Sequence, residues 1–209
     1  MTLASRGEPP VGPARLIATT EVPTKWGRFT CHAFRSTDDG QEHVAFSLGE
    51  VATGGEVLVR VHSECLTGDV FGSWRCDCGA QLHAAMAAIA SCGNGVLVYL
   101  RGHEGRGIGI GHKVQAYALQ DEGRDTVDAN LELGLPVDDR TYGIGVAILA
   151  ELGVERVALM TNNPTKHNGL AAFGLEICRR VPLEVPPRAE NEHYLRTKQQ
   201  RLGHLLNLV

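Results

Sequence analysis

A chain of 209 residues, 43% hydrophobic and 21% charged, is long enough for one substantial core and has a globular composition. Its net charge of −4 argues against a general nucleic-acid-binding protein, which is normally basic. No stretch approaches an apolar membrane span, and residues 1–14 lack the apolar core of a signal peptide. We therefore expect a flexible leader at residues 1–14, no membrane association and a cytoplasmic location.

Two short strands are predicted at residues 28–34 and 42–49, separated by the turn sequence STDDGQ. Residues 56–64 predict a further strand, in which apolar Val57, Val59 and Val61 alternate with other side chains. This strand ends immediately before Cys65. An alanine-rich helix at residues 81–90 and a buried strand at residues 95–100 are expected to follow.

Helices and strands alternate in the second half of the chain. Helical spacing is found at residues 112–120 and 141–153, where Gly153 stops the second helix. A buried strand at 154–161, a helix at 164–174, a strand at 175–185 and a final polar-faced helix at 191–206 complete the pattern. The alternation predicts a single α/β domain with a mixed β-sheet flanked by helices and an N-terminal antiparallel portion.

Three of the six cysteines, Cys65, Cys76 and Cys78, have the spacing C-x10-C-x-C. Without an export signal, clustered cysteines are more typical of metal ligands than of disulfides. Three thiolates suit zinc and leave the fourth tetrahedral position for a water whose pKa is lowered to about 7. The spacing therefore favours a catalytic zinc site, with three buried cysteines and no metal as the alternative. The cysteines at 31, 92 and 178 are expected to be structural.

Other zinc sites fit this segment less well. The sequence HSEC contains H-x-E, half of a zinc deaminase signature, but the later pair is C-x-C rather than P-C-x-x-C. A zinc ribbon would need paired C-x2-C knuckles, which the chain lacks. We therefore do not expect His62 to be a metal ligand.

A glycine-rich loop, LRGHEGRGIGIGHK, runs from a buried strand toward a helix. Its backbone N–H groups could hold phosphate oxygens, although a tight structural turn explains the glycines equally well. Each cation in or beside the glycine-rich and loop-like segments would by itself be a solvated surface charge, but their clustering keeps an anionic small-molecule substrate open. These cations are Arg60, Arg75, Arg101, Arg106, Lys113, Arg140 and Lys166.

The motifs RVHSECLTGD, RCDCGAQL, EGRGIG, AYALQD, DTVDAN and LMTNNPTK occur in this order, and with them the chain resembles GTP cyclohydrolase II from about residue 15 to the C-terminal tail. The resemblance implies a GTP cyclohydrolase II-like catalytic domain at residues 15–209. It also implies hydrolysis of GTP to 2,5-diamino-6-ribosylamino-4(3H)-pyrimidinone 5′-phosphate, with release of formate and pyrophosphate, as the first step of riboflavin biosynthesis. One zinc ion per chain on Cys65, Cys76 and Cys78, magnesium with the triphosphate, and a homodimer are expected on the same ground.

The resemblance also implies a GTP-binding set of residues: Arg60, Val61, His62, Ser63, Glu64, Gln81, Glu104, Gly105, Arg106, Thr126, Thr161 and Lys166. Arg106 and Lys166 match the charge of phosphates, and Gln81 can offer both a donor and an acceptor to the purine.

The resemblance implies three catalytic residues. Asp138 would be a proton acceptor, and Arg140 a nucleophile toward the α-phosphorus. Because a guanidinium titrates above about 12, stabilisation of charge by Arg140 is an open alternative. Tyr117 would serve the deformylation step. Two departures from the common family pattern, an apparent insertion at His103 and a small residue at Gly111, bear on loop mobility and substrate fit.

Two further hypotheses remain open from the sequence. A zinc aminohydrolase acting on a nucleobase would not release formate from GTP. A non-catalytic nucleotide-binding regulator would bind GTP without turnover, and a fourth protein ligand would complete its structural zinc site.

Overall fold

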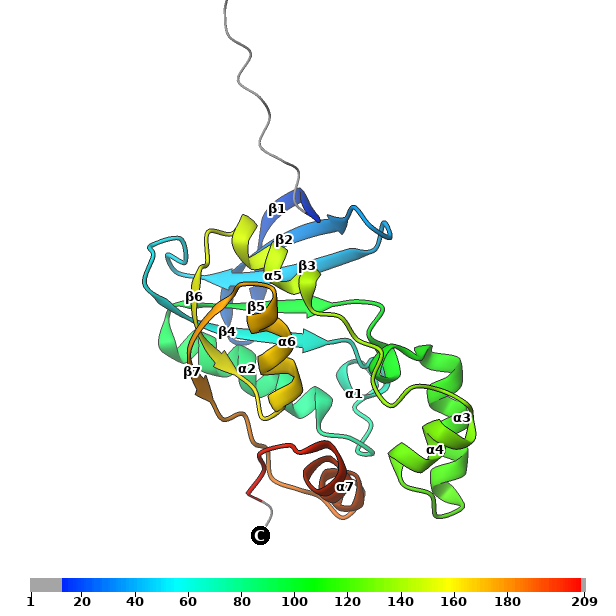
Figure 1. Cartoon of the computed structure of the whole chain (residues 1–209). Coiled ribbons are helices and arrows are strands. Elements are labelled where there is room, and N and C mark those ends of the chain that lie inside the picture. The colour runs from blue at the N-terminus through cyan, green and yellow to red at the C-terminus, as the bar shows by residue number, and fades with distance from the viewer. Residues whose placement is uncertain (1–12, 208–209) are drawn as a thin grey trace, which may run out of the picture.

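The structure, a computed structural model, describes residues 13–207 (Figure 1). Its seven-stranded mixed sheet has the order β1-β2-β3-β5-β4-β6-β7. The antiparallel part consists of β1 (Ala14–Thr24), β2 (Gly27–Ser36) and β3 (Glu42–Leu48), with β3 antiparallel to β5. The parallel part consists of β5 (Gly95–Leu100), β4 (Glu56–Ser63), β6 (Arg156–Met160) and β7 (Glu176–Val181). The predicted fold class is confirmed.

The N-terminal strand β1 was not predicted from the sequence. Most of the predicted leader, residues 1–12, lies outside the described residues. Its last residue, Ala14, is buried and pairs with Ser36 at the start of β1. Because β1 is an edge strand with mostly exposed side chains, including Leu16 and Ile17, its sequence lacks the alternation that marks a half-buried strand.

Helices cover both faces of the sheet. On one face, α5 (Gly143–Glu151) and α6 (Pro164–Ala172) lie over the strands, and Ile148, Leu149 and Leu170 pack in the larger hydrophobic core (Figure 1). On the other face, α2 (Cys78–Cys92) packs Ala85, Met86 and Ile89 into a second core. The sheet is therefore the middle of three layers.

Strand β4 divides its side chains between these two cores. Val57, Val59 and Val61 point into the core under α5 and α6, as their alternation predicted. Leu58 packs on the α2 side. Because side chains alternate along a strand, Arg60 and His62 follow Leu58 on that side and extend the α2 face with polar groups.

The remaining helical segments gather near the carboxyl ends of the parallel strands (Figure 1). They are α1 (Leu66–Asp69), the 3₁₀ turn η1 (Glu104–Gly107), α3 (Gly109–Asp121), α4 (Thr126–Glu132) and α7 (Glu192–Leu202). Asp125 caps α4 by accepting from the backbone N–H groups of Val127 and Asp128. Arg201 Nη1 of α7 also donates to Asp125 and Asp128, which joins α7 to the start of α4.

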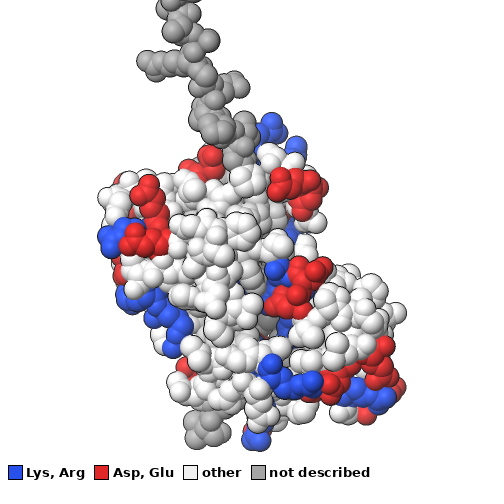
Figure 2. All heavy atoms as spheres, in the orientation of Figure 1, with Lys and Arg blue, Asp and Glu red and all other residues white. Residues whose placement is uncertain are grey.

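The surface carries charges of both signs. On the face shown in Figure 2, basic and acidic side chains are interspersed and neither sign forms an extended surface. Within residues 13–207, no helix has both the length and the apolar character needed to span a bilayer.

Candidate active site

Loops that follow parallel strands meet at one edge of the sheet. Glu64 and Cys65 follow β4, residues 101–107 follow β5, and residues 161–163 follow β6. β4 lies between β5 and β6, and the helices that connect these strands cover opposite faces. Such a switch point is where α/β sheets bind ligands. A cavity at this edge is lined by residues from all three loops and from α2, α3, α4 and α7.

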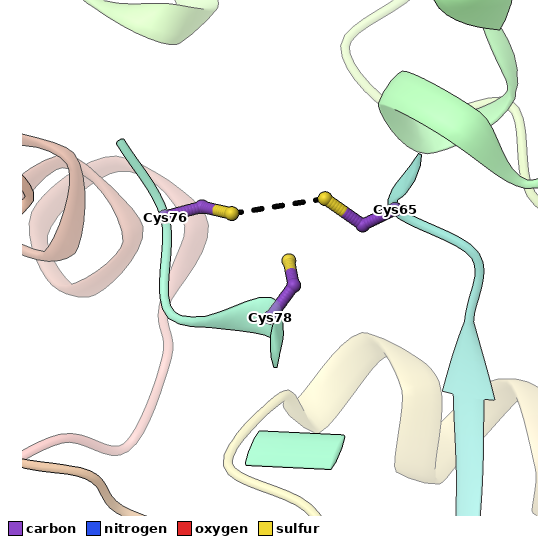
Figure 3. A group of neighbouring side chains, drawn as sticks. All are labelled: Cys65, Cys76 and Cys78. Carbon is purple, nitrogen blue, oxygen red and sulfur yellow. Dashed lines mark hydrogen bonds between the residues drawn. The ribbon is translucent and has the colours of Figure 1, made fainter. Parts of the chain in front are cut away.

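The sulfur atoms of Cys65, Cys76 and Cys78 converge at this cavity (Figure 3). They lie within 4.8 Å of one another, and the Cys65 and Cys76 sulfurs are 3.7 Å apart. Two sulfurs bound to one tetrahedral zinc at about 2.3 Å would be separated by about 3.8 Å, so the spacing suits this ion. Among the described residues, no fourth His, Cys, Asp or Glu joins the group. The three thiols can therefore hold a metal ion and leave one position for another ligand.

Two glycines let α1 and α2 approach closely around the cysteines. A Cβ at Gly68 would lie 2.9 Å from the Cys76 sulfur and 3.2 Å from the Cys65 sulfur. A Cβ at Gly79 would lie 2.2 Å from the carbonyl oxygen of Gly68. Because real Cβ contacts are longer, both positions need glycine for this packing. The cysteine group is thus built into the contact between the two helices.

Lys113 of α3 is the charged partner of the cysteine group. Its Nζ donates to the Cys65 sulfur at 3.1 Å, to Thr67 Oγ1 at 2.9 Å and to Glu104 Oε1 at 2.5 Å. Hydrogen bonds from Cys76 and Cys78, together with Lys113, lower the pKa of Cys65. Because Cys76 and Cys78 donate hydrogen bonds to Cys65, their own thiols hold their protons more tightly. The pKa of Cys76 is raised to about 12, and the pKa of Cys78 is raised as well. Lys113 therefore supports negative charge on the sulfur cluster.

His62 is held by a carboxylate rather than directed at the cysteines. Its Nε2 lies 3.0 Å from both oxygens of Asp69, and its ring stacks on Tyr99. Asp69 Oδ2 also accepts from the Tyr99 hydroxyl and from the backbone N–H of Cys65. Burial lowers the pKa of His62. Through Asp69, the His62 ring helps to hold the backbone at Cys65.

A buried polar network connects β4 to α7 behind the cysteines. Arg60 Nη2 donates to Gln81 Oε1 at 2.8 Å, and Gln81 Nε2 donates to Asp77 Oδ2 at 2.6 Å. Lys198 Nζ donates to both oxygens of Asp77, at 2.9 and 3.0 Å. Arg60 Nη1 also donates to the carbonyl oxygen of Met160. All four side chains of the network line the cavity.

Arg140, which lines the cavity, forms a bidentate ion pair with Asp138. Arg140 Nε and Nη2 donate to the two carboxylate oxygens of Asp138, at 2.8 and 2.5 Å. Burial alone would lower the pKa of Arg140, but the hydrogen bonds to Asp138 raise it above its ordinary value. Burial alone would raise the pKa of Asp138, but Arg140 lowers it. The pair therefore holds both groups in their charged forms.

Three other cations of the cavity, Lys166, Arg60 and Arg106, lack a carboxylate partner among the described residues. Lys166 is 5% exposed, and its Nζ donates to the carbonyl oxygen of Val61 at 3.0 Å. Burial, and then the neighbouring cations Arg60 and Arg140, lower its pKa well below the ordinary value. Arg60 Nε and Arg106 Nη1 are buried and have no hydrogen-bond acceptor among the described residues. An anion entering the cavity would compensate these positive charges.

The backbone of η1 has an uncommon conformation beside the cavity. Gly105 and Arg106 both have positive φ, at 61° and 65°. Arg106 is the only non-glycine residue with positive φ in the described part of the chain. Strained backbone of this kind clusters at functional sites. The N–H groups of Gly105 and Arg106 donate within the loop, to Glu104 Oε1 at 3.2 Å and to the carbonyl oxygen of His103 at 3.1 Å.

Tyr117 is linked to the cysteine group through the hydroxyl of Thr67. Its hydroxyl lies 3.3 Å from Thr67 Oγ1, which lies 3.8 Å from the Cys65 sulfur. Burial raises the pKa of Tyr117, so the phenol stays protonated near neutral pH. Arg75 covers the ring at 4.9 Å and pairs with Asp121.

The structure brings most of the sequence-predicted site residues together. Those that line the cavity are Arg60, His62, Ser63, Glu64, Cys65, Cys76, Cys78, Gln81, Gly105, Arg106, Tyr117, Thr126, Arg140, Thr161 and Lys166. Three other predicted site residues, Val61, Glu104 and Asp138, do not line the cavity. The Val61 side chain is in the core and offers only its carbonyl oxygen to Lys166. Glu104 accepts from Lys113 and the backbone N–H of Leu66, and Asp138 supports Arg140.

The predicted roles did not include several residues that the structure places in the site. Lys113 stood out in the sequence only as one cation in a loop-like segment. Asp77 and Lys198 gave no signal, because a C-x-C spacer residue and a lysine on a polar helix are ordinary surface residues until their contact is known.

The sequence profile of the GTP cyclohydrolase II family matches residues 15–182. The probable bifunctional riboflavin biosynthesis protein RIBA 2, chloroplastic, of Oryza sativa subsp. japonica is 59% identical over 93% of this chain and 36% of its own length. The riboflavin biosynthesis protein RibBA of Salinispora arenicola (strain CNS-205) is 59% identical over 91% of this chain and 46% of its own length. The chain thus spans less than half of the length of these relatives.

A solved structure gives a likeness in fold alone. RibBX, a two-domain 3,4-dihydroxy-2-butanone 4-phosphate synthase from A. baumannii, is 21% identical with a TM-score of 0.50, over 82% of this chain and 41% of that chain.

Fold and site together define an α/β protein in which a group of three cysteines, able to hold a metal ion, faces a cavity rich in cations. The profile match and the identities of 59% show the family. The chain belongs to the GTP cyclohydrolase II family.

Proposed function

We propose that this protein hydrolyses GTP, opening the imidazole ring and releasing formate and pyrophosphate. The product would be 2,5-diamino-6-ribosylamino-4(3H)-pyrimidinone 5′-phosphate, made as the first step of riboflavin biosynthesis. The observation that carries this proposal is the convergence of three sulfurs, with no fourth protein ligand among the described residues, on a cavity with unpaired cations. Ring opening needs an activated water, and a triphosphate needs positive charge.

Cys65, Cys76 and Cys78 would hold zinc, which when bound supplies an activated water for attack at guanine C8. Lys113 keeps a positive charge beside the Cys65 sulfur. Asp69 fixes the backbone of Cys65. These contacts hold the ligands in place before substrate binds, which reduces the reorganisation needed during reaction.

The unpaired cations would bind the phosphates. The Lys166 side chain is buried, and the buried Nη1 atom of Arg106 has no hydrogen-bond acceptor among the described residues. Magnesium would accompany the triphosphate and neutralise part of its charge. Ser63, Glu64, Thr126 and Thr161 are proposed to complete the GTP site around these charged groups.

We assign Arg140 to charge stabilisation rather than to covalent attack. Nucleophilic attack needs a neutral guanidine, but the pKa of Arg140 is raised and that of its proposed proton acceptor, Asp138, is lowered. Proton transfer between them is therefore uphill in the resting site. A fixed guanidinium can instead stabilise charge developing on the α-phosphate while water attacks.

For the protein as a whole, a homodimer in the cytoplasm without nucleic-acid or membrane partners is proposed. A nucleobase aminohydrolase and a non-catalytic regulator are the competing functions. The three-sulfur group without a fourth ligand among the described residues argues against a closed, structural zinc site.

The decisive experiment mixes the protein with zinc, magnesium and GTP and identifies the products by mass spectrometry. Stoichiometric formate, pyrophosphate and the diaminopyrimidine are expected. Cys76→Ser should lose both bound zinc and ring opening, because a neutral hydroxyl is a poor substitute for a thiolate. Cys92→Ser, at an exposed cysteine on the end of α2, is the matched control and should keep both. Release of ammonia without formate, or GTP binding without turnover, would refute the proposed reaction.

A further inference from the structure

Asp77, the residue between the proposed metal ligands Cys76 and Cys78, does not use its side chain as a helix cap. It stands at the N-cap position of α2, where an aspartate usually accepts from the first backbone N–H groups of the helix. The Asp77 carboxylate accepts from none of them. It is 2% exposed and needs other donors, because a buried charge without partners is costly. Gln81 Nε2, on the next turn of α2, supplies one of them at 2.6 Å.

The other donors come from α7, 121 residues further along the chain. Lys198 Nζ donates to both oxygens of Asp77, at 2.9 and 3.0 Å, and Lys198 is 7% exposed. Asn191, the N-cap residue of α7, is buried and donates from Nδ2 to the carbonyl oxygen of Cys76 at 3.5 Å. α7 therefore holds the C-D-C segment both by the spacer side chain and by the backbone of a metal ligand. The family profile ends at residue 182, before α7 begins.

The third cysteine is held by different parts of the molecule. Lys113 of α3 donates to the Cys65 sulfur at 3.1 Å, and Asp69 of α1 accepts from the Cys65 backbone N–H at 3.0 Å. Neither contact involves α7. The placement of two sulfurs relative to the third therefore depends on how firmly α7 holds the C-D-C segment.

α7 is anchored away from the cysteines and forms part of the cavity wall. Arg201 Nη1 donates to Asp128 of α4 at 2.7 Å, and after the helix the backbone N–H of Leu205 donates to the carbonyl oxygen of Asn162 at 2.8 Å. Tyr194, Lys198 and His204 line the cavity. One helix thus contacts both the segment that carries two sulfurs and the space in front of them.

We propose that Lys198 and Asn191 are positioning residues for the metal ligands Cys76 and Cys78, and that metal binding and the docking of α7 stabilise each other. The inference rests on the metal site of the proposed function and not on its reaction. Contacts that fix a ligand from outside the metal limit its motion, and their loss typically costs about 10–100-fold in metal affinity. Coupling of this kind is reciprocal, so the metal stabilises the docked α7 by the same factor. The metal therefore also secures the cavity wall that α7 forms.

The first test measures zinc affinity by competition with a chelator of known affinity. Lys198→Met should bind zinc about 10–100-fold more weakly than the wild-type protein. Lys198→Arg keeps the charge and should restore most of the affinity. Arg196→Met, on the exposed side of α7 where Arg196 pairs with Glu192, is the matched control and should bind zinc as the wild-type protein does. Equal zinc affinity in Lys198→Met and the wild-type protein would overturn the inference.

Unfolding with and without zinc separates positioning from a general loss of stability. Lys198→Met leaves a buried carboxylate without its counter-charge, which by itself destabilises a protein. That effect lowers the free energy of unfolding equally in zinc-loaded and zinc-free protein, whereas positioning lowers it more in the zinc-loaded form. The double variant Asp77→Asn with Lys198→Met removes both charges and should still bind zinc more weakly than the wild-type protein. Equal losses in the two forms, or wild-type zinc affinity in the double variant, contradict the inference.

Amide hydrogen exchange tests the reverse direction. Removal of zinc from the wild-type protein should speed exchange in α7, while α5, which packs in the core on the opposite face of the sheet from α2, should keep its exchange rate. In Lys198→Met, zinc removal should change exchange in α7 much less. Exchange in α7 that does not respond to zinc in the wild-type protein would overturn the inference.

These readings are separate from the proposed reaction. Zinc affinities and exchange rates as expected, without release of formate from GTP, contradict the reaction only. Normal turnover with unaltered zinc affinity in Lys198→Met contradicts the inference only. A wild-type protein that binds no zinc contradicts the proposed metal site and the inference with it.

Discussion

The Arg140 guanidinium is held more firmly than a surface arginine would be. Its two parallel hydrogen bonds to Asp138 fix a planar fork, and its side chain is 12% exposed. Lys166 lies 5.3 Å and Arg140 5.8 Å from the centre of the Tyr142 ring, so both cations share one aromatic neighbour. A fixed cation at this place costs little reorganisation when charge develops on a phosphate.

Arg140→Ala should therefore lower the rate of pyrophosphate release by roughly 10²–10³-fold, the usual effect of removing one fixed donor to a developing charge. Arg140→Lys keeps the charge but loses the planar fork, and it should recover part of the rate. Initial rates from a coupled pyrophosphate assay measure both. A lysine variant as inactive as the alanine variant would instead favour covalent attack by the guanidine.

Tyr117 is the residue that we propose as proton donor for the deformylation step. Opening the ring leaves a formyl amide, and its hydrolysis requires a proton on the departing nitrogen. The Tyr117 hydroxyl lies near the cysteines through Thr67 and stays protonated, because burial raises its pKa.

Tyr117→Phe should keep zinc and pyrophosphate release but accumulate the formylamino pyrimidine. The loss of a placed proton donor should slow deformylation by roughly 10²–10⁴-fold. Mass spectrometry of the products distinguishes the two pyrimidines. Formate release at the wild-type rate would show that Tyr117 is only an aromatic side chain packed beside the site.

At the scale of elements, the close packing of α1 on the first turn of α2 brings the three cysteines together. Gly68 and Gly79 face each other with no room for a side chain, so the cysteines before and within these helices converge. Neither glycine has a positive φ, which means that close packing alone explains the residue type.

Gly68→Ala should speed loss of zinc to a chelator by about tenfold or more, because its Cβ would displace the Cys76 and Cys65 sulfurs. Gly111→Ala, in α3, is the matched control: no atom lies within 4 Å of its added Cβ, and its φ is not positive. Alanine there should stabilise the helix by up to about 1 kcal/mol and leave zinc release unchanged. Equal release rates in the two variants would contradict the packing argument.

The predicted elements that proved correct are those with a strong local signal. The helices α2 and α5 have alanine-rich or apolar sequences, and α6 begins at a proline. Gly153, with a φ of 71°, follows the end of α5 as expected. The short helices α1 and α4 and the 3₁₀ turn η1 were not predicted. Each is four to seven residues long, and such segments depend on tertiary packing rather than on their own propensity.

For the whole molecule, the accumulation of positive charge in the cavity affects stability as well as binding. His103 lies between Ser63 and Tyr142 in the loop after β5. Burial, and then Arg140 and Lys166, lower its pKa to about 4. An unfolded chain takes up a proton at His103 below pH of about 6.5, whereas the folded protein does so only near its lowered pKa. Protonation therefore favours the unfolded state as the pH falls from about 6.5 toward 4.

His103→Gln should remove this dependence. Relative to the variant, the wild-type protein should lose roughly 1–2 kcal/mol of unfolding free energy between pH 7.5 and 5.0. Urea denaturation of both proteins at the two pH values measures the difference, and the comparison cancels the titration of all other groups. A difference that does not change with pH would mean that His103 titrates normally in the folded protein.

The sequence by itself determined the α/β class, the main helices and strands and the spacing of the three clustered cysteines. The signals for these features are local. The helices and strands follow from the period of the hydrophobic residues, and the three cysteines lie within a segment of fourteen residues that runs from the end of β4 to the start of α2. Only the tertiary structure decided which charges meet. Lys113 reaches Cys65 across 48 residues and Lys198 reaches Asp77 across 121. The free energy of such contacts comes from burial that the packing of α3 and α7 creates, and no local pattern in the chain records that packing.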